Sequence, residues 1–111
     1  LGLRKAPGGL RLVAAVAKDA AGGAPDREIV SLPTSGGSRV YLRVTVGKGG
    51  MCRFSWSADN RAFAAIGDDF VAKPGRWVGA KVGLFAAARP GSPSSRAGHA
   101  DWSWFRVEPP I

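Results

Sequence analysis

Glycine and proline residues occur along the whole length of this chain, and their spacing limits the secondary structure that it can form. The 16 glycines and 8 prolines lie between short apolar segments rather than together in one linker. Both residues are unfavourable inside helices, whereas both are common in turns. The pattern therefore predicts many short strands joined by turns, with no long helix.

The composition supplies enough apolar material for a core. The 111 residues fit one domain or a part of one, and 45% of them are hydrophobic, including 4 Trp and 5 Phe. A chain of this size buries roughly two-thirds of its extended surface on folding. The sequence contains no run of about eighteen apolar residues, so it predicts no membrane-spanning helix and no membrane partner.

The clearest strand is predicted at 39–46, RVYLRVTV, where apolar residues alternate with Arg39, Tyr41, Arg43 and Thr45. In the next segment Cys52, Phe54 and Trp56 form a buried face, and Arg53, Ser55 and Ser57 form a polar face. Further strands are predicted at 10–17, 27–32, 63–66, 70–72, 77–86 and 101–108. Seven or eight short strands with regular turns indicate an all-β, antiparallel β-sandwich.

Cys52 is the only cysteine, which excludes an intrachain disulfide and a metal site made of cysteines. Its place in an alternating apolar segment predicts a buried, unreactive thiol. A single buried thiol is compatible with the cytoplasm and with a secreted protein, so the localisation stays open.

The formal net charge is +8, which permits contact with nucleic acid or with an acidic surface. The basic residues are dispersed, however, and Arg4–Lys5 is their only adjacent pair. Dispersed arginines favour solvated strand faces. Nucleic-acid binding is the less favoured interpretation, since it would require the arginines to converge on one surface.

A hairpin turn is predicted in the stretch FSWSADNRAFAAIG, residues 54–67. Asn60 tolerates a left-handed backbone, and the side chain of Asp59 can accept hydrogen bonds from nearby amides. Ser57 can add a side-chain hydrogen bond of the same kind. These three residues are therefore expected to form the turn.

The same stretch resembles the F-x-Y-S-x-D-G-x-x-F hairpin of concanavalin A-like domains, with Trp56 at the aromatic position and Asn60 at the glycine position. VYLRV precedes it at 40–44, and IGDDF follows at 66–70. GRWVGAKVGLFA at 75–86 and ADWSWFRV at 100–107 come next. In this order the pieces are similar to the C-terminal concanavalin A-like domain of family 43 glycoside hydrolases, the β-xylosidase and α-L-arabinofuranosidase group. The resemblance implies a concanavalin A-like jelly roll.

Two departures from that family affect the expectations. Trp102 and Ser103 stand where the family usually has Phe and Asp in A-D-F-D-W-F, which puts any role of that aspartate in doubt. The family's domain is also nearly twice as long, and the chain opens with LGLRKAPGG, without an initiator Met. Residues 1–111 are therefore expected to be one concanavalin A-like domain or its C-terminal portion. The missing strands would be replaced by a second copy or another chain, unless the chain rearranges into a smaller sandwich.

No catalytic residue, cofactor or metal site is predicted. Glycoside hydrolysis needs two carboxylates at a set separation, and the only adjacent pair, Asp68–Asp69, would point in opposite directions on a strand. His99, the sole histidine, is expected at the surface. No nucleotide, zinc or nucleophile-elbow motif occurs. In the resembled enzymes, the catalytic acids lie in a separate five-bladed propeller.

Carbohydrate contact is predicted for exposed aromatic and polar residues. Sugar rings present C–H faces that stack on aromatic rings, and polar neighbours bind the hydroxyls. The candidates are Trp102 and Trp104, expected on one face of the last strand, together with Tyr41 and Arg43. For the two tryptophans packing is the favoured role and ligand contact is the alternative, whereas Trp56 and Trp77 are expected in the core.

Two functions therefore stand ahead of nucleic-acid binding. The first is a non-catalytic accessory domain of a xylan- or arabinan-degrading glycoside hydrolase, which packs on the catalytic five-bladed propeller and shapes its substrate entrance. The second is an independent carbohydrate-binding module with xylo- or arabino-oligosaccharides as ligands. The expected partners are accordingly the propeller, such an oligosaccharide and, through the incomplete sandwich, a second copy of the chain.

Overall fold

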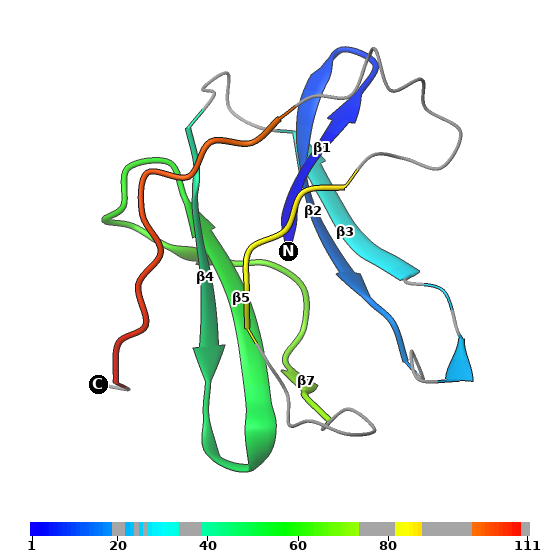
Figure 1. Ribbon diagram of the computed structural model, residues 1–111, viewed down its shortest axis with the longest axis vertical. Coiled ribbons are helices and arrows are strands. Elements are labelled where there is room, and N and C mark those ends of the chain that lie inside the picture. Colours follow the sequence, from blue (N-terminus) through cyan, green and yellow to red (C-terminus); the bar gives the residue numbers. More distant parts are fainter. Residues whose placement is uncertain are drawn as a thin grey trace. The chain divides into compact units, whose positions relative to one another are not determined.

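The computed structural model describes residues 1–18, 22–23, 25, 27–33, 39–73, 82–87 and 99–109. The chain divides into two compact units, Leu1–Ala80 and Lys81–Ile111. All the strands assigned to the described residues lie in the first unit, where they form two antiparallel sheets (Figure 1).

The first sheet has the order β1-β2-β3. It consists of β1 (Gly2–Ala6), β2 (Gly9–Val16) and β3 (Arg27–Pro33), and each pair is antiparallel. The β1–β2 hairpin turns at Pro7 and Gly8, where Gly8 has a φ of 87°. β1 was not predicted from the sequence, because its apolar and charged residues alternate over only five positions.

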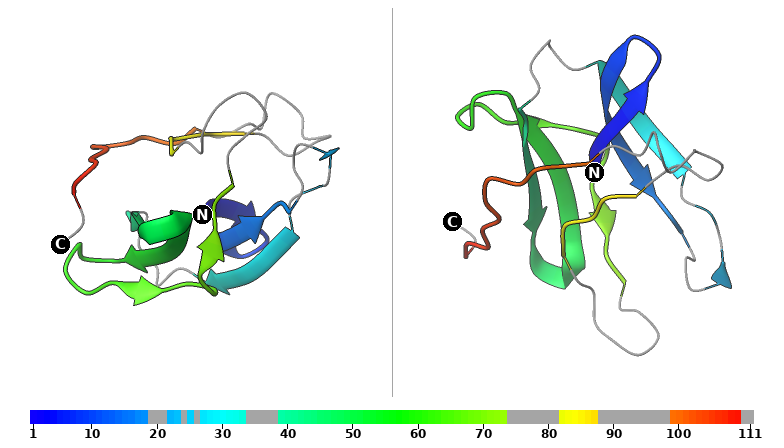
Figure 2. Two further views of the ribbon diagram at one scale, coloured as in Figure 1. Left: turned by 90° about the horizontal axis from the view of Figure 1, so that it is seen from below. Right: turned by 45° about the horizontal axis from the view of Figure 1, so that its top comes forward.

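The second sheet is built around β5 (Met51–Ser57), which pairs with β4 (Tyr41–Val46), β6 (Ala64–Ala65) and β7 (Phe70–Val71). A 3₁₀ turn at Lys48–Gly50 joins β4 to β5. Figure 2 shows the β4–β5 ribbon and the β1-β2-β3 sheet as two separate, twisted sheets.

Both sheets contribute to the core. Leu12 and Ala14 of β2 are buried together with Ile66, which lies between β6 and β7. Leu42, Phe54 and Trp56 of the second sheet pack against this cluster, as do Leu1 and Val30. The cross-strand pairs Leu42–Trp56 and Val44–Phe54 place the alternating apolar residues of β4 and β5 on the same face, as predicted.

The all-β, antiparallel β-sandwich expected from the sequence is confirmed by these two antiparallel sheets. The predicted strands at 10–17, 27–32, 39–46, 52–57, 63–66 and 70–72 correspond to β2 through β7, with small shifts at their ends. Cys52 is buried, 4% exposed, and Trp56 packs on the core, both as predicted.

Two strand predictions differ from the structure. No strand is assigned over 82–87 or 99–109, although strands were predicted at 77–86 and 101–108. Alternation in the sequence shows which side chains would share a face of a strand. A strand also needs backbone hydrogen bonds to a neighbouring strand, and this pairing depends on the tertiary structure. The remainder of the first prediction, including Trp77, lies outside the described residues.

The polar face predicted for β5 is also not a solvated face throughout. Ser55 is 8% exposed and Ser57 only 2%, whereas Arg53 on the same face is exposed. Both serines are short and sit opposite longer residues, Arg43 and Tyr41, in the β4–β5 register. Small side chains between long neighbours lose solvent contact even on an outward face.

Candidate functional site

The side chain of Asp59 holds the turn that follows β5. Its Oδ1 atom accepts hydrogen bonds from the Ser57 hydroxyl at 2.8 Å, the Arg61 backbone N–H at 2.8 Å and the Ala62 backbone N–H at 3.1 Å. These donors, the Arg61 N–H foremost, hold the pKa of Asp59 below its ordinary value of 3.8. Asp59 is therefore an ionised structural acceptor, poorly suited to act as a general acid.

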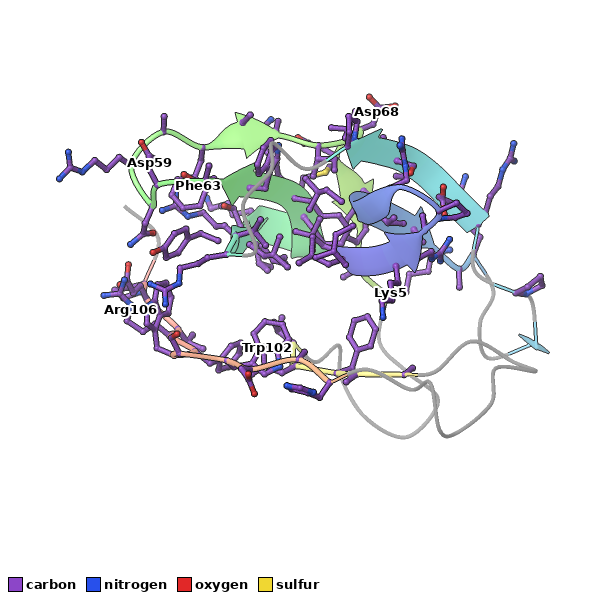
Figure 3. All side chains as sticks on the ribbon, turned by 90° about the horizontal axis from the view of Figure 1, so that it is seen from above. Lys5, Asp59, Phe63, Asp68, Trp102 and Arg106 are labelled. Atoms are coloured by element: carbon purple, nitrogen blue, oxygen red, sulfur yellow. The ribbon has the colours of Figure 1, made fainter. Side chains whose placement is uncertain are left out.

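Asn60 completes this turn with a φ of 62°, in the left-handed region. Asp59 and Phe63 mark the turn in Figure 3, on the loop that returns the chain to β6. The structure thus brings Ser57, Asp59 and Asn60 together in a single turn. The Ser57–Asp59 hydrogen bonds and the left-handed backbone of Asn60 stabilise the shape of that turn.

Tyr41 and Arg43 lie on the outward face of β4, opposite Ser57 and Ser55. The Cζ atom of Arg43 is 3.6 Å from the centroid of the Phe63 ring, which is a close cation–π contact. Phe63 was not recognised from the sequence as a partner of Arg43. The alternation of β4 places Arg43 outward, but the aromatic that reaches it depends on how the Asp59 turn folds.

Trp102 and Trp104 belong to the second unit, and each is 47% exposed. The guanidinium of Arg106 lies over Trp104, with its Cζ atom 4.4 Å from the ring centroid. Figure 3 labels Trp102 and Arg106 in this segment. No strand is assigned at these residues, although the two tryptophans were predicted on one face of a strand. Their half-exposed rings leave apolar surface accessible.

The carboxylates of the first unit are used mainly in ion pairs and turns. Arg53 binds Asp69 in a bidentate pair, Nε to Oδ1 at 2.8 Å and Nη2 to Oδ2 at 2.8 Å. The Arg53 hydrogen bonds hold the pKa of Asp69 below its ordinary value of 3.8. Glu28 is paired with Arg4. An ionised, paired carboxylate cannot donate the proton that glycoside hydrolysis requires.

The described residues hold no group of three or more His, Cys, Asp or Glu side chains that could bind a metal ion. His99, 86% exposed, lies 3.5 Å from the carboxylate of Asp101. In the same described part of the chain, no helix is long and apolar enough to cross a membrane.

Comparison with known families gives one match. The family model described as the beta-xylosidase C-terminal concanavalin A-like domain matches residues 1–108, which span both compact units. No curated protein and no solved structure gives a significant match.

Proposed function

The chain belongs to the beta-xylosidase C-terminal concanavalin A-like domains, and on this premise we propose that it is the accessory domain of a xylan- or arabinan-degrading glycoside hydrolase. In this role it packs on the catalytic five-bladed propeller and shapes the entrance to the substrate site. Residues 1–111 then act as one concanavalin A-like domain or as its C-terminal portion.

The family match over residues 1–108 carries this proposal. The side chains add a second argument, since Asp59, Asp69 and Glu28 are occupied by turn or arginine contacts. In this proposal these three carboxylates have structural roles, and another domain supplies the acid and the nucleophile.

The proposal is tested by mixing the 111-residue chain with the propeller of a family 43 β-xylosidase prepared without its own C-terminal domain. We expect a 1:1 complex in sedimentation and a change in KM for xylobiose, because an accessory domain at the entrance alters substrate access. The chain alone should not hydrolyse an aryl xyloside.

The propeller's own C-terminal domain, added back in the same way, is the positive control. If that domain restores the complex and this chain gives neither association nor a change in KM, the accessory role is wrong. Hydrolysis by the chain alone would also contradict it.

A second candidate function, an independent carbohydrate-binding module, is favoured by the half-exposed rings of Trp102 and Trp104. Exposed tryptophans form stacking platforms for sugars. Titration of the chain with neutral xylotriose and arabinotriose, followed by tryptophan fluorescence, separates the two functions. The accessory role predicts no saturable change. A saturable change that disappears in Trp102→Ala and Trp104→Ala would establish the binding module instead.

A further inference from the structure

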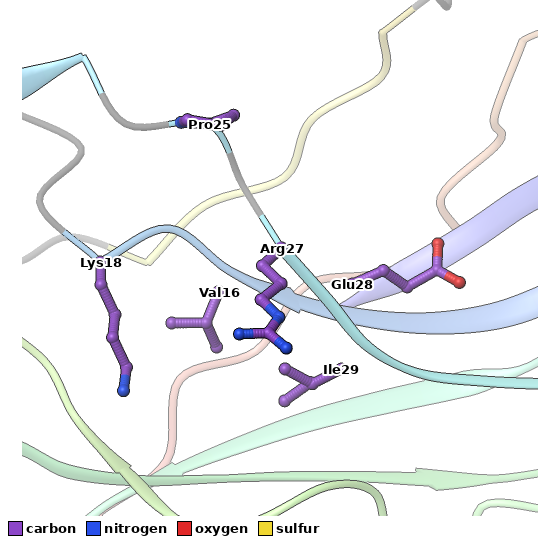
Figure 4. Close-up of a pocket in the computed structure, with 6 residues that line it drawn as sticks. All are labelled: Val16, Lys18, Pro25, Arg27, Glu28 and Ile29. Atoms are coloured by element: carbon purple, nitrogen blue, oxygen red, sulfur yellow. The ribbon is translucent and has the colours of Figure 1, made fainter.

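A surface hollow of about 480 Å³ lies where β2 ends, at Val16, and where β3 begins, at Arg27. It is partly open to solvent, and its described lining residues are Val16, Lys18, Pro25, Arg27, Glu28 and Ile29 (Figure 4). Small-molecule sites in proteins commonly have volumes of roughly 300–1,000 Å³. The hollow therefore has room for a mono- or disaccharide unit.

A β-bulge lies among the residues that line this hollow. Ala14 pairs with Val30, but the next residue, Ala15, pairs with Glu28, so that Ile29 is the extra residue on β3. Bulges redirect side chains and occur frequently beside binding sites. Figure 4 shows Val16, Arg27 and Ile29 on the same side of the two strands, while Glu28 points away.

The hollow combines an apolar floor with two cations. Val16 and Ile29 provide the floor, and Ile29 is 43% exposed although it is a large aliphatic residue. Lys18 and Arg27 are exposed beside them. Among the described residues no carboxylate pairs with either cation, since Glu28 is bound by Arg4. Asp19 and Asp26, their neighbours in the sequence, lie outside the described residues.

We propose that this hollow binds a carboxylate-bearing saccharide, that is, a uronic acid unit. The C–H face of the sugar ring lies on Val16 and Ile29, and its carboxylate is bound by Lys18 and Arg27. The planar guanidinium fork matches a carboxylate in two hydrogen bonds, and the ammonium adds a second charge. The saccharide part of this inference rests on the proposed function, whereas the anionic and apolar parts rest on the hollow itself.

The test is an NMR titration of the ¹⁵N-labelled 111-residue chain with two matched ligands, xylotriose carrying a glucuronic acid substituent and neutral xylotriose. We expect the acidic ligand alone to shift the amides of Val16, Lys18 and Arg27 to Ile29. The double variant K18Q/R27Q should bind it at least roughly ten-fold more weakly, because charge-assisted hydrogen bonds are lost.

The control is K48Q/R61Q, which removes the same charge from turns that do not line the hollow. Three results would overturn the proposal. These are equal shifts with the neutral ligand, an equal loss of affinity in the control, or displacement of the acidic ligand by equimolar inorganic phosphate. If K18Q/R27Q does not fold, as judged by circular dichroism, the comparison of the two ligands on the unsubstituted chain decides. Association with the propeller is measured separately, so failure of the accessory role and failure of this site are distinguishable.

Discussion

Ser57 and Asp59 are joined by two hydrogen bonds: the Ser57 hydroxyl donates to Asp59 Oδ1 at 2.8 Å and accepts from the Asp59 backbone N–H at 3.2 Å. Ser57 is 2% exposed, whereas Asp59 is exposed, so the two hydrogen bonds lie at the edge between the buried strand and the solvent. It fixes the chain at the point where β5 ends and the return to β6 begins. The stability of the β5–β6 hairpin should therefore depend on this small polar pair.

Ser57→Ala should lower the free energy of unfolding by about 1 kcal/mol, because the variant loses both hydrogen bonds that the Ser57 hydroxyl makes with Asp59. Urea unfolding followed by tryptophan fluorescence measures the effect. Ser103→Ala, at an exposed serine of the second unit, is the matched control and should leave the midpoint unchanged. Equal midpoints for the two variants would contradict a structural role for the pair.

Asn60→Val should destabilise the chain by about 1–2 kcal/mol, whereas Asn60→Gly should be tolerated. Asn60 has a φ of 62°, and a left-handed backbone is costly for a β-branched residue but not for glycine. The measurement is the difference in unfolding free energy between the two variants. Equal unfolding free energies for the valine and glycine variants would contradict a left-handed backbone at Asn60.

Gly50→Ala should be more destabilising than Gly49→Ala. Gly50 and Gly49 have left-handed φ angles of 78° and 69°, so the alanine substitution should strain the backbone by a similar free energy at both positions. A Cβ atom on Gly50 would lie 3.0 Å from the Ala72 carbonyl oxygen, whereas one on Gly49 would meet nothing within 4 Å. The Gly50 carbonyl also accepts the Ala72 N–H at 2.9 Å. Thermal unfolding of the two variants should show a lower Tm for Gly50→Ala, and the reverse order would refute the β5–β7 contact.

Stability should fall as the pH drops below about 4, because Asp59 and Asp69 both have pKa values below their ordinary value of 3.8 in the folded chain. A lowered folded-state pKa means that the unfolded chain binds protons first. The contribution of these carboxylates is therefore complete above the unfolded pKa and is lost as the pH falls through the folded pKa.

Urea midpoints measured between about pH 6 and pH 2.5 would reveal this dependence. The variant D59N/D69N should show a flatter profile than the unsubstituted chain, since it cannot lose these two charges. Parallel profiles for the two proteins would show that other groups govern the acid sensitivity.

Several strands and one turn of the first unit could be predicted from local sequence patterns. The alternation in RVYLRVTV and in Cys52, Phe54 and Trp56 predicts β4, β5 and their shared apolar face. Ser57, Asp59 and Asn60 predict their own turn, because side chains of these types bond to nearby backbone. These inferences succeed because each depends on residues within a few positions of one another.

The candidate site could be predicted only in part. Tyr41 and Arg43 could be placed on the outward face of β4 from alternation, but the stacking of Arg43 on Phe63 depends on the path of the turn between them. The hollow lined by Lys18 and Arg27 was not predicted from the sequence, since it depends on how β2 and β3 are placed beside one another. Alternation also predicted strands at 77–86 and 101–108, and the structure assigns no strand to the described residues 82–86 and 101–108.

By itself, the sequence determined the all-β class, the inward faces of its central strands, the Asp59 turn and, through the order of its motifs, the family. Only the tertiary structure decided which strands pair, that Ser55 and Ser57 are buried, and that a bulge at Ile29 lies in a hollow lined by Lys18 and Arg27. The physical reason is that side-chain periodicity is a property of one strand. Register, burial and cavities arise when separate strands are brought together, so no single segment encodes them.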